Sequence, residues 1–179
     1  MAIFLIILSV LLWIGAIVTL PKKALLSPAL SFVGLLVISL ARRDGFQIIP
    51  VNNTILTGWL CMTVVVMLAT YMQPVPVRNS ARGTGYIIIG GLMGLMLGLL
   101  GFTFSSNLSM LYSVMIVGVI AGVFFGFLLF SRTPGGDGIN MQSGHFFKYL
   151  FAKGFPTAIT LMQIGVVLVI VVALNQLNP

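Results

Sequence analysis

The side chains able to carry chemistry are few and far apart. His145 is the single histidine and Cys61 the single cysteine, and the acidic residues are Asp44 and Asp137, with no glutamate. Metal sites need several His, Cys or carboxylate ligands, and catalysis needs a nucleophile beside a base or two neighbouring carboxylates. We therefore expect no catalytic residue, no metal site and no cofactor, and we predict that the chain is not an enzyme.

Polar side chains inside the apolar segments are the next candidates, and Gln163 is the most informative of them. An amide surrounded by hydrocarbon must find a hydrogen-bonding partner. We expect Gln163 to form an interhelical hydrogen bond worth about 1 kcal/mol; the alternative is that it lines a path for a substrate. Since no charged residue falls inside a predicted membrane span, a proton relay, a carboxylate ion site and a voltage sensor all lack the group that they require.

The composition is that of a membrane protein. Hydrophobic residues make up 59% of the chain and charged residues 6%, against about 25% charged residues in a soluble domain. Nine Lys and Arg give a net charge of +7, but they lie between apolar segments, where basic residues set topology and contact anionic lipid head groups. We therefore expect an anionic lipid bilayer as a partner and no nucleic acid.

Apolar runs of about the 20 residues that a bilayer span needs predict an all-α integral membrane protein, a bundle of six transmembrane helices. The predicted spans are residues 2–20, 24–40, 54–72, 84–104, 108–130 and 156–174. The second run is the shortest, and whether it crosses fully stays open. The longest connection, 131–155, has 25 residues and is too short to fold alone, so one membrane domain is predicted over residues 1–179.

The distribution of Lys and Arg predicts the orientation. Seven of the nine lie in the first, third and fifth connections, and only Arg42 and Arg43 lie in the second. The positive-inside rule then places the odd connections in the cytoplasm and both termini outside it. If the run 24–40 did not cross, every later segment would be inverted. Nothing in the chain resembles an organellar address, which favours a bacterial inner membrane.

Glycines recur at close to every fourth position in the fourth and fifth predicted spans. In lipid, small residues at this spacing let two helix backbones approach closely and gain dispersion contact. We therefore expect these spans, TM4 and TM5, to form a tight hairpin. The predicted helix-packing residues are Gly90, Gly91, Gly94, Gly98, Gly101, Gly118, Gly122 and Gly126. Whether these small-residue faces serve the chain itself or a partner stays open.

The segment Ser143–Gly154 has the pattern of a short amphipathic helix on the cytoplasmic membrane surface. Phe147 and Phe151 are expected to lie in the acyl boundary, with Lys148 and Lys153 near the head groups. Gly154 is expected to end this helix, and Pro156 to begin the sixth span. The segment would act as an anchored connector or as a docking site for a lipid or partner.

Three functions fit this description. The leading hypothesis is a non-catalytic subunit or assembly factor of a membrane complex, with other membrane subunits or further copies of the chain as partners. The alternative is a small transporter or the substrate-binding membrane component of an uptake system. A lipid-acting intramembrane enzyme is the third.

One short stretch bears on the second hypothesis. Gly83-Thr84-Gly85-Tyr86, which runs into the first set of glycines, resembles a glycine-rich helix start in the membrane components of biotin uptake systems. The resemblance implies vitamin binding, but it covers only this part of the chain. The polar pocket residues that such a role needs are not evident, so the chain is not assigned to that family.

Overall fold

The computed structural model describes residues 2–43, 46–101, 108–136 and 144–177. Most of the described part is helical, and two-residue strands, β1 (Arg42–Arg43) and β2 (Phe46–Gln47), pair antiparallel. The α-helices are α1 (Ala2–Thr19), α2 (Ser27–Ser39), α3 (Asn53–Tyr71), α4 (Val75–Arg78), α5 (Thr84–Leu100), α6 (Leu108–Ser131), α7 (Gly144–Tyr149) and α8 (Phe155–Leu177). A 3-10 turn follows α6 at Pro134–Gly136, and a π-helix, Leu150–Gly154, joins α7 to α8.

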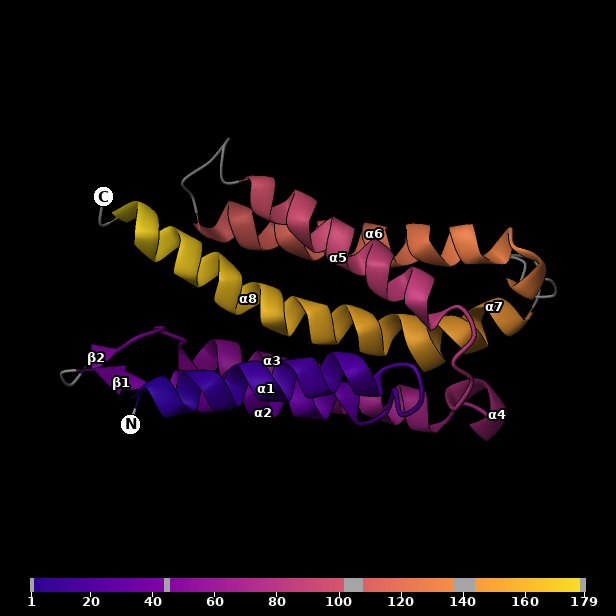
Figure 1. Cartoon of the computed structure of the whole chain (residues 1–179), viewed down its shortest axis with the longest axis horizontal. Helices are drawn as coiled ribbons and strands as arrows, with labels where there is room; N and C mark the ends of the chain where they lie inside the picture. Colours follow the sequence, from indigo (N-terminus) through magenta and orange to yellow (C-terminus); the bar gives the residue numbers. More distant parts are fainter. Residues whose placement is uncertain (1, 44–45, 102–107, 137–143, 178–179) are drawn as a thin grey trace.

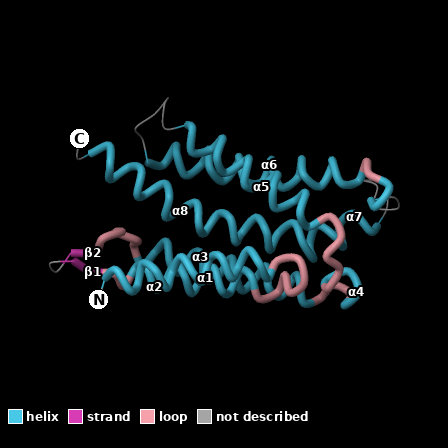
Figure 2. Tube along the Cα trace, viewed as in Figure 1, coloured by secondary structure: helices cyan, strands magenta, loops and turns pink. Residues whose placement is uncertain are grey.

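Helix α8 lies at the centre of the molecule. It contacts α1, α2 and α3 on one side and α5 and α6 on the other (Figure 1). The long helices run roughly parallel or antiparallel, and the loops lie at the two ends of the bundle (Figure 2). Both termini and the β1–β2 ribbon lie at one end, and α4 and α7 lie at the opposite end (Figure 1).

Four helical stretches in the described part are long and apolar enough to cross a membrane: Ala2–Thr19, Asn53–Tyr71, Leu108–Ser131 and Gly144–Leu174. An all-helical membrane protein with several spans is therefore supported. The remaining apolar helices are shorter. Helix α2 has 13 residues and α5 has 17, and at 1.5 Å per residue α2 is about 20 Å long, against a hydrocarbon core of about 30 Å. Residues 102–104 of the fourth predicted span lie outside the described residues.

The predicted surface helix at 143–154 is wrong as a separate element. Residue 143 lies outside the described residues, and from Gly144 the chain is helical without a break to Leu177. Pro156 therefore does not begin a helix. Inside a helix its ring clashes with the carbonyl four residues earlier and removes one hydrogen bond. The π-helical turn directly before Pro156 accommodates the ring, and the Phe155 N–H bonds to the Leu150 carbonyl.

Two threonine hydroxyls donate hydrogen bonds to backbone carbonyls of this turn. The Thr70 hydroxyl of α3 donates to the Phe151 carbonyl at 3.1 Å, and the Thr157 hydroxyl donates to the Lys153 carbonyl at 2.7 Å. In an apolar environment an unsatisfied carbonyl is costly, and Ser or Thr side chains commonly replace the missing backbone donors near proline. The irregular turn is thus held in place by α3 as well as by its own helix.

Helices α5 and α6 form the most extensive helix pair. A Cβ atom added at Gly90, Gly94 or Gly98 of α5 would come closer than 3.0 Å to the backbone of α6. The same holds for Gly118, Gly122 and Gly126 against the backbone of α5. A Cβ atom at Gly91 would meet the side chains of Leu161 of α8 and Val123 of α6, and one at Gly101 would meet Val114 of α6. The two backbones therefore touch along most of α5.

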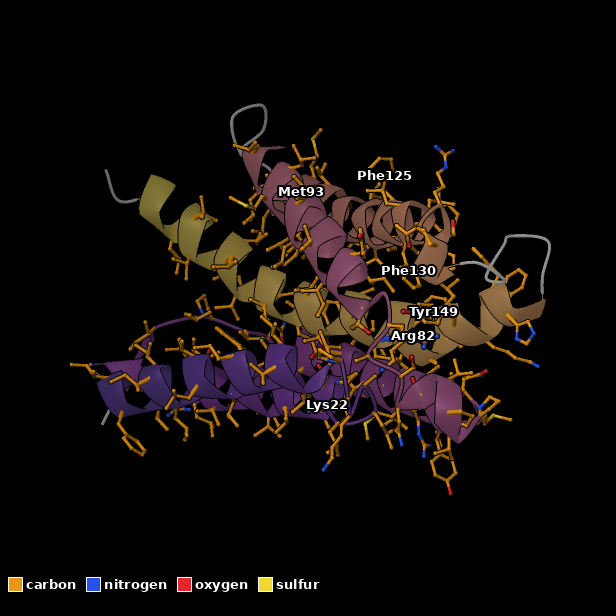
Figure 3. The ribbon with its side chains drawn as sticks, turned by 45° about the vertical axis from the view of Figure 1, so that its right-hand side comes forward. Lys22, Arg82, Met93, Phe125, Phe130 and Tyr149 are labelled. Carbon is orange, nitrogen blue, oxygen red and sulfur yellow. The ribbon has the colours of Figure 1, made fainter. Side chains whose placement is uncertain are left out.

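Aromatic side chains close the end of the bundle at α7. Tyr149 stacks on Phe130 with ring centroids 6.0 Å apart, and its hydroxyl donates to the Arg82 carbonyl (Figure 3). Gly83 follows with φ of +72°, and a Cβ atom there would collide with the Phe130 ring. Glycine is needed at this position for both its positive φ and its lack of a side chain. The connection into α5 is therefore fixed against α6 and α7.

Candidate functional site

A large apolar cavity lies between α3, α6 and α8. Its volume is about 660 Å³, and it is open on one side. Helix α8 and the π-turn form its floor from Leu150 to Val166, and the walls are α3 from Ile55 to Met62 and α6 from Tyr112 to Phe124. No lining residue is charged. This volume falls in the range of about 300–1,000 Å³ that is typical of small-molecule sites, which are mostly apolar with few polar groups.

The cavity follows α8 over much of its length. Its lining residues on the floor extend over 16 positions, from Leu150 to Val166, which at 1.5 Å per residue is about 24 Å.

Tyr112 is among the lining residues, but its hydroxyl is buried and has no hydrogen-bond partner within the described structure. Buried tyrosine hydroxyls usually find a partner. Gln163 of α8 also has a buried atom without a hydrogen-bond partner, its Oε1.

A polar seam occupies the opposite face of α8. We use this name for Lys153, Thr157, Thr160 and Gln163, all with 0% of their surface exposed. The Thr160 hydroxyl hydrogen-bonds to the Ser27 hydroxyl of α2 at 3.0 Å, and Gln163 Nε2 donates to the Thr63 hydroxyl of α3 at 2.7 Å. These bonds join α8 to α2 and α3. Gln163 thus forms an interhelical hydrogen bond through Nε2, whereas its Oε1 has no hydrogen-bond partner.

Lys153 is fully buried, and its expected place near the head groups is wrong. Its Nζ donates to the Pro21 carbonyl at 2.8 Å and to the Leu20 carbonyl at 3.4 Å. These carbonyls follow the C-terminal end of α1, where the helix dipole is negative and the last carbonyls lack donors. The π-turn, which an α-helical pattern does not anticipate, directs Lys153 inward. The ammonium group therefore ties the central helix to α1.

The other predicted interface residues lie on the surface. Phe147 and Lys148 of α7 are exposed, and Phe151 is 36% exposed. Phe146 is instead buried against Phe127, with ring centroids 4.8 Å apart. The structure thus leaves Phe147, Lys148 and Phe151 where lipid or a partner could contact them, and it removes Lys153 from that group.

Of the residues considered first for chemistry, the two that the structure describes lie on separate helices. His145 and Cys61 are both exposed, His145 on α7 and Cys61 on α3. Asp44 and Asp137 lie outside the described residues. Among the described residues there is no group of three or more His, Cys, Asp and Glu side chains that could hold a metal ion.

Sequence reasoning missed the cavity and the polar seam for different reasons. The seam had a readable signal, since Lys153, Thr157, Thr160 and Gln163 follow one another at spacings of four, three and three, which places them on one helical face. It was missed because the helix was expected to start at Pro156. The cavity lies between walls that are far apart in the chain, and its apolar residues look the same in sequence as those that face lipid.

Comparison of the chain with protein-family models, with curated proteins and with solved structures found no match.

Proposed function

We propose that this protein is a non-catalytic membrane protein that holds the hydrocarbon chain of a lipid-like ligand in the cavity between α3, α6 and α8. The observation that carries the proposal is the cavity itself, with its volume of about 660 Å³ and its uncharged lining. Apolar surface gains free energy when an apolar ligand fills it closely. Such a protein would act as an accessory or carrier component, which agrees with the scarcity of reactive side chains.

The uncharged lining favours an apolar occupant. Its extent along α8, about 24 Å, suits an extended hydrocarbon chain. A substrate-binding role in uptake stays compatible with this proposal, for an apolar substrate.

The glycines of α5 and α6 support a packing role within the chain. Gly94 and Gly118 lie against each other's helices, as do Gly90 and Gly122. Because these faces are already covered, they are not free to receive a partner. If the protein joins a larger complex, the contact would be made through other surfaces, such as the exposed Phe147 and Lys148 of α7.

Membrane placement follows from the basic residues. We propose that α2 and α5 cross together with the four longer helices, so that the six-helix bundle spans the bilayer. The connections that carry Lys22, Lys23, Arg78, Arg82 and Arg132 then lie in the cytoplasm of a bacterial cell and contact anionic lipids. Both termini lie outside. Figure 1 supports this arrangement, because the termini lie at the end opposite α4 and α7.

Photolabelling tests the proposed site directly. Hexadecane carrying a diazirine at mid-chain is added to the protein in phosphatidylcholine vesicles, irradiated, and mapped by peptide mass spectrometry. We expect saturable labelling at buried cavity residues such as Ile159 and Met162, and non-saturable labelling at Ile7 and Leu11, which are exposed on α1. Saturation separates a site from general contact with lipid.

Two glycine variants make the test specific. Gly58 lines the cavity and Gly15 lies on α1, and a Cβ atom at either would have nothing within 4 Å. Gly58→Phe should fill the cavity and abolish the saturable labelling, whereas Gly15→Phe should leave it unchanged. The proposal fails if cavity labelling is not saturable in the wild-type protein, or if Gly58→Phe retains it.

A further inference from the structure

A row of exposed phenylalanines leads from the surface of α7 to the cavity. Phe155 lines the cavity and is 38% exposed, so it lies at the open side. Phe151 packs on Phe155 with ring centroids 5.0 Å apart. Phe147 is exposed and precedes Phe151 by four positions, which places the two on one helical face. We call Phe147, Phe151 and Phe155 the aromatic row. It extends the apolar lining towards the end of the bundle at α7 (Figure 1).

Lys148 lies where the aromatic row reaches the end of the bundle. It is exposed and precedes Phe151 by three positions, a spacing at which side chains on a helix are neighbours. The cavity floor begins at Leu150, so the backbone of Lys148 lies about 3 Å beyond it along the helix axis. The apolar stem of a lysine packs on such surfaces while its ammonium group reaches the head groups. An apolar path out of the cavity thus ends beside a positive charge.

No described side chain supplies a counter-charge for Lys148. The two acidic residues of the chain, Asp44 and Asp137, lie outside the described residues. Further basic residues, among them Lys22 before α2 and Arg78 in α4, lie at the same end of the bundle (Figure 1). Basic residues at the cytoplasmic surface of a membrane attract anionic lipids. Charge complementarity therefore favours a negative head group at this end.

We infer that the ligand is an anionic phospholipid of the cytoplasmic leaflet, with one acyl chain in the cavity and its phosphate group paired with Lys148. The chain leaves the cavity over the aromatic row. Because the cavity is open on one side, the second acyl chain can remain in the bilayer, which favours a phospholipid over a single-chain anion. The inference rests on the proposed function, since it requires that the cavity hold a hydrocarbon chain. It adds the charge of the head group and the direction of the chain.

Competition against the photoactivatable hexadecane tests the inference. At pH 7, part of the phosphatidylcholine in the vesicles is replaced, at equal mole fraction, by anionic phosphatidylglycerol, zwitterionic phosphatidylethanolamine or the single-chain anion hexadecyl sulfate. Saturable labelling at the cavity residues Ile159 and Met162 measures occupancy. In the wild type, phosphatidylglycerol should compete about 2- to 5-fold better than phosphatidylethanolamine, the effect of one basic residue at the head groups. High salt should reduce this advantage.

Two lysine variants make the test specific. Lys148→Gln removes the charge proposed to bind the head group, so the advantage of phosphatidylglycerol should disappear. Hexadecane is uncharged, and its saturable labelling reports in each variant whether the cavity is intact. Lys22→Gln is the matched control, because it removes the same charge from an exposed residue that does not line the cavity and lies on the α1–α2 side of the bundle (Figure 3). This variant should keep the advantage.

Four results would overturn the inference: no advantage of phosphatidylglycerol in the wild type, an advantage that persists in Lys148→Gln, an equal loss in Lys22→Gln, or hexadecyl sulfate as the best competitor. Absence of saturable labelling by hexadecane in the wild type would instead overturn the proposed function, and the inference with it.

Discussion

Lys153 shows how a single residue can be misplaced by an otherwise reasonable pattern. In sequence it follows a run of aromatic and basic residues, and Gly154 and Pro156 come directly after it. These are the ordinary signals for the end of one helix and the start of the next. The helix nevertheless continues, because the π-turn accommodates Pro156. A pattern based on 3.6 residues per turn fails at such a turn, so Lys153 was assigned to the wrong face.

The environment of Lys153 predicts that its removal destabilises the fold. In Lys153→Met the carbonyls of Leu20 and Pro21 lose their donor, and a buried acceptor without a partner costs about 1–3 kcal/mol. We expect the unfolding free energy in mild detergent to fall by about this amount. Denaturant titration followed by circular dichroism measures it.

Lys148→Met is the matched control for this variant. Lys148 is exposed on α7, and exposed substitutions usually change stability by no more than about 0.5 kcal/mol. If Lys153→Met were as stable as the wild type, the two carbonyls would not depend on the ammonium group, and the assigned role of Lys153 would be wrong.

At the scale of elements, the positions of the helices could be predicted better than the faces that they bury. Predicted span 54–72 corresponds to α3 (Asn53–Tyr71), and 108–130 corresponds to α6 (Leu108–Ser131). Long apolar runs bounded by proline, glycine and basic residues give clear signals. The run 24–40 gave a shorter helix, α2 (Ser27–Ser39). The face that each helix buries was less predictable, because apolar residues serve equally against lipid and against another helix.

The contact between α5 and α6 predicts opposite effects of alanine at two glycines of α5. At Gly94 the added Cβ atom would lie closer than 3.0 Å to the Gly118 backbone, whereas at Gly85 it would meet nothing within 4 Å. Gly94→Ala must push the helices apart and should destabilise the protein by about 1–3 kcal/mol, the usual cost of overpacking. Gly85→Ala should be neutral or stabilise it by up to about 1 kcal/mol through helix propensity.

Thermal unfolding of both variants in the same detergent measures this difference. Equal stability of the two variants would contradict the close approach of α5 and α6. Loss of a larger complex from Gly94→Ala with unchanged stability of the isolated chain would instead indicate that this glycine face binds a partner.

At the scale of the whole molecule, the proposed topology predicts opposite sides for the first and second connections. Lys22 lies between α1 and α2, and Gln47 lies in β2 between α2 and α3; both are exposed. In a Cys61→Ser background, which removes the single native cysteine, an impermeant maleimide should label Gln47→Cys in intact spheroplasts. Lys22→Cys should react only after permeabilisation. Labelling of both positions from the same side would show that α2 does not cross.

The cavity belongs to the whole molecule, and for that reason no segment of the sequence predicts it. Gly58, Tyr112 and Ala158 come from three helices, and the space between them depends on how α3 and α6 diverge around α8. Composition predicted a membrane protein, and the long apolar helices support that prediction. The uncharged walls became informative only once the helices were placed.

The most direct test of the central claim is the thermal stability of the protein with increasing hexadecane. A ligand that binds only the folded state stabilises it by about 2.7 kcal/mol at 100 times its Kd. We predict a saturable rise in Tm for the wild type and for Gly15→Phe, and none for Gly58→Phe, whose side chain already occupies the cavity. No rise in the wild type, or an equal rise in Gly58→Phe, would contradict the assignment of this cavity as a binding site for a hydrocarbon chain.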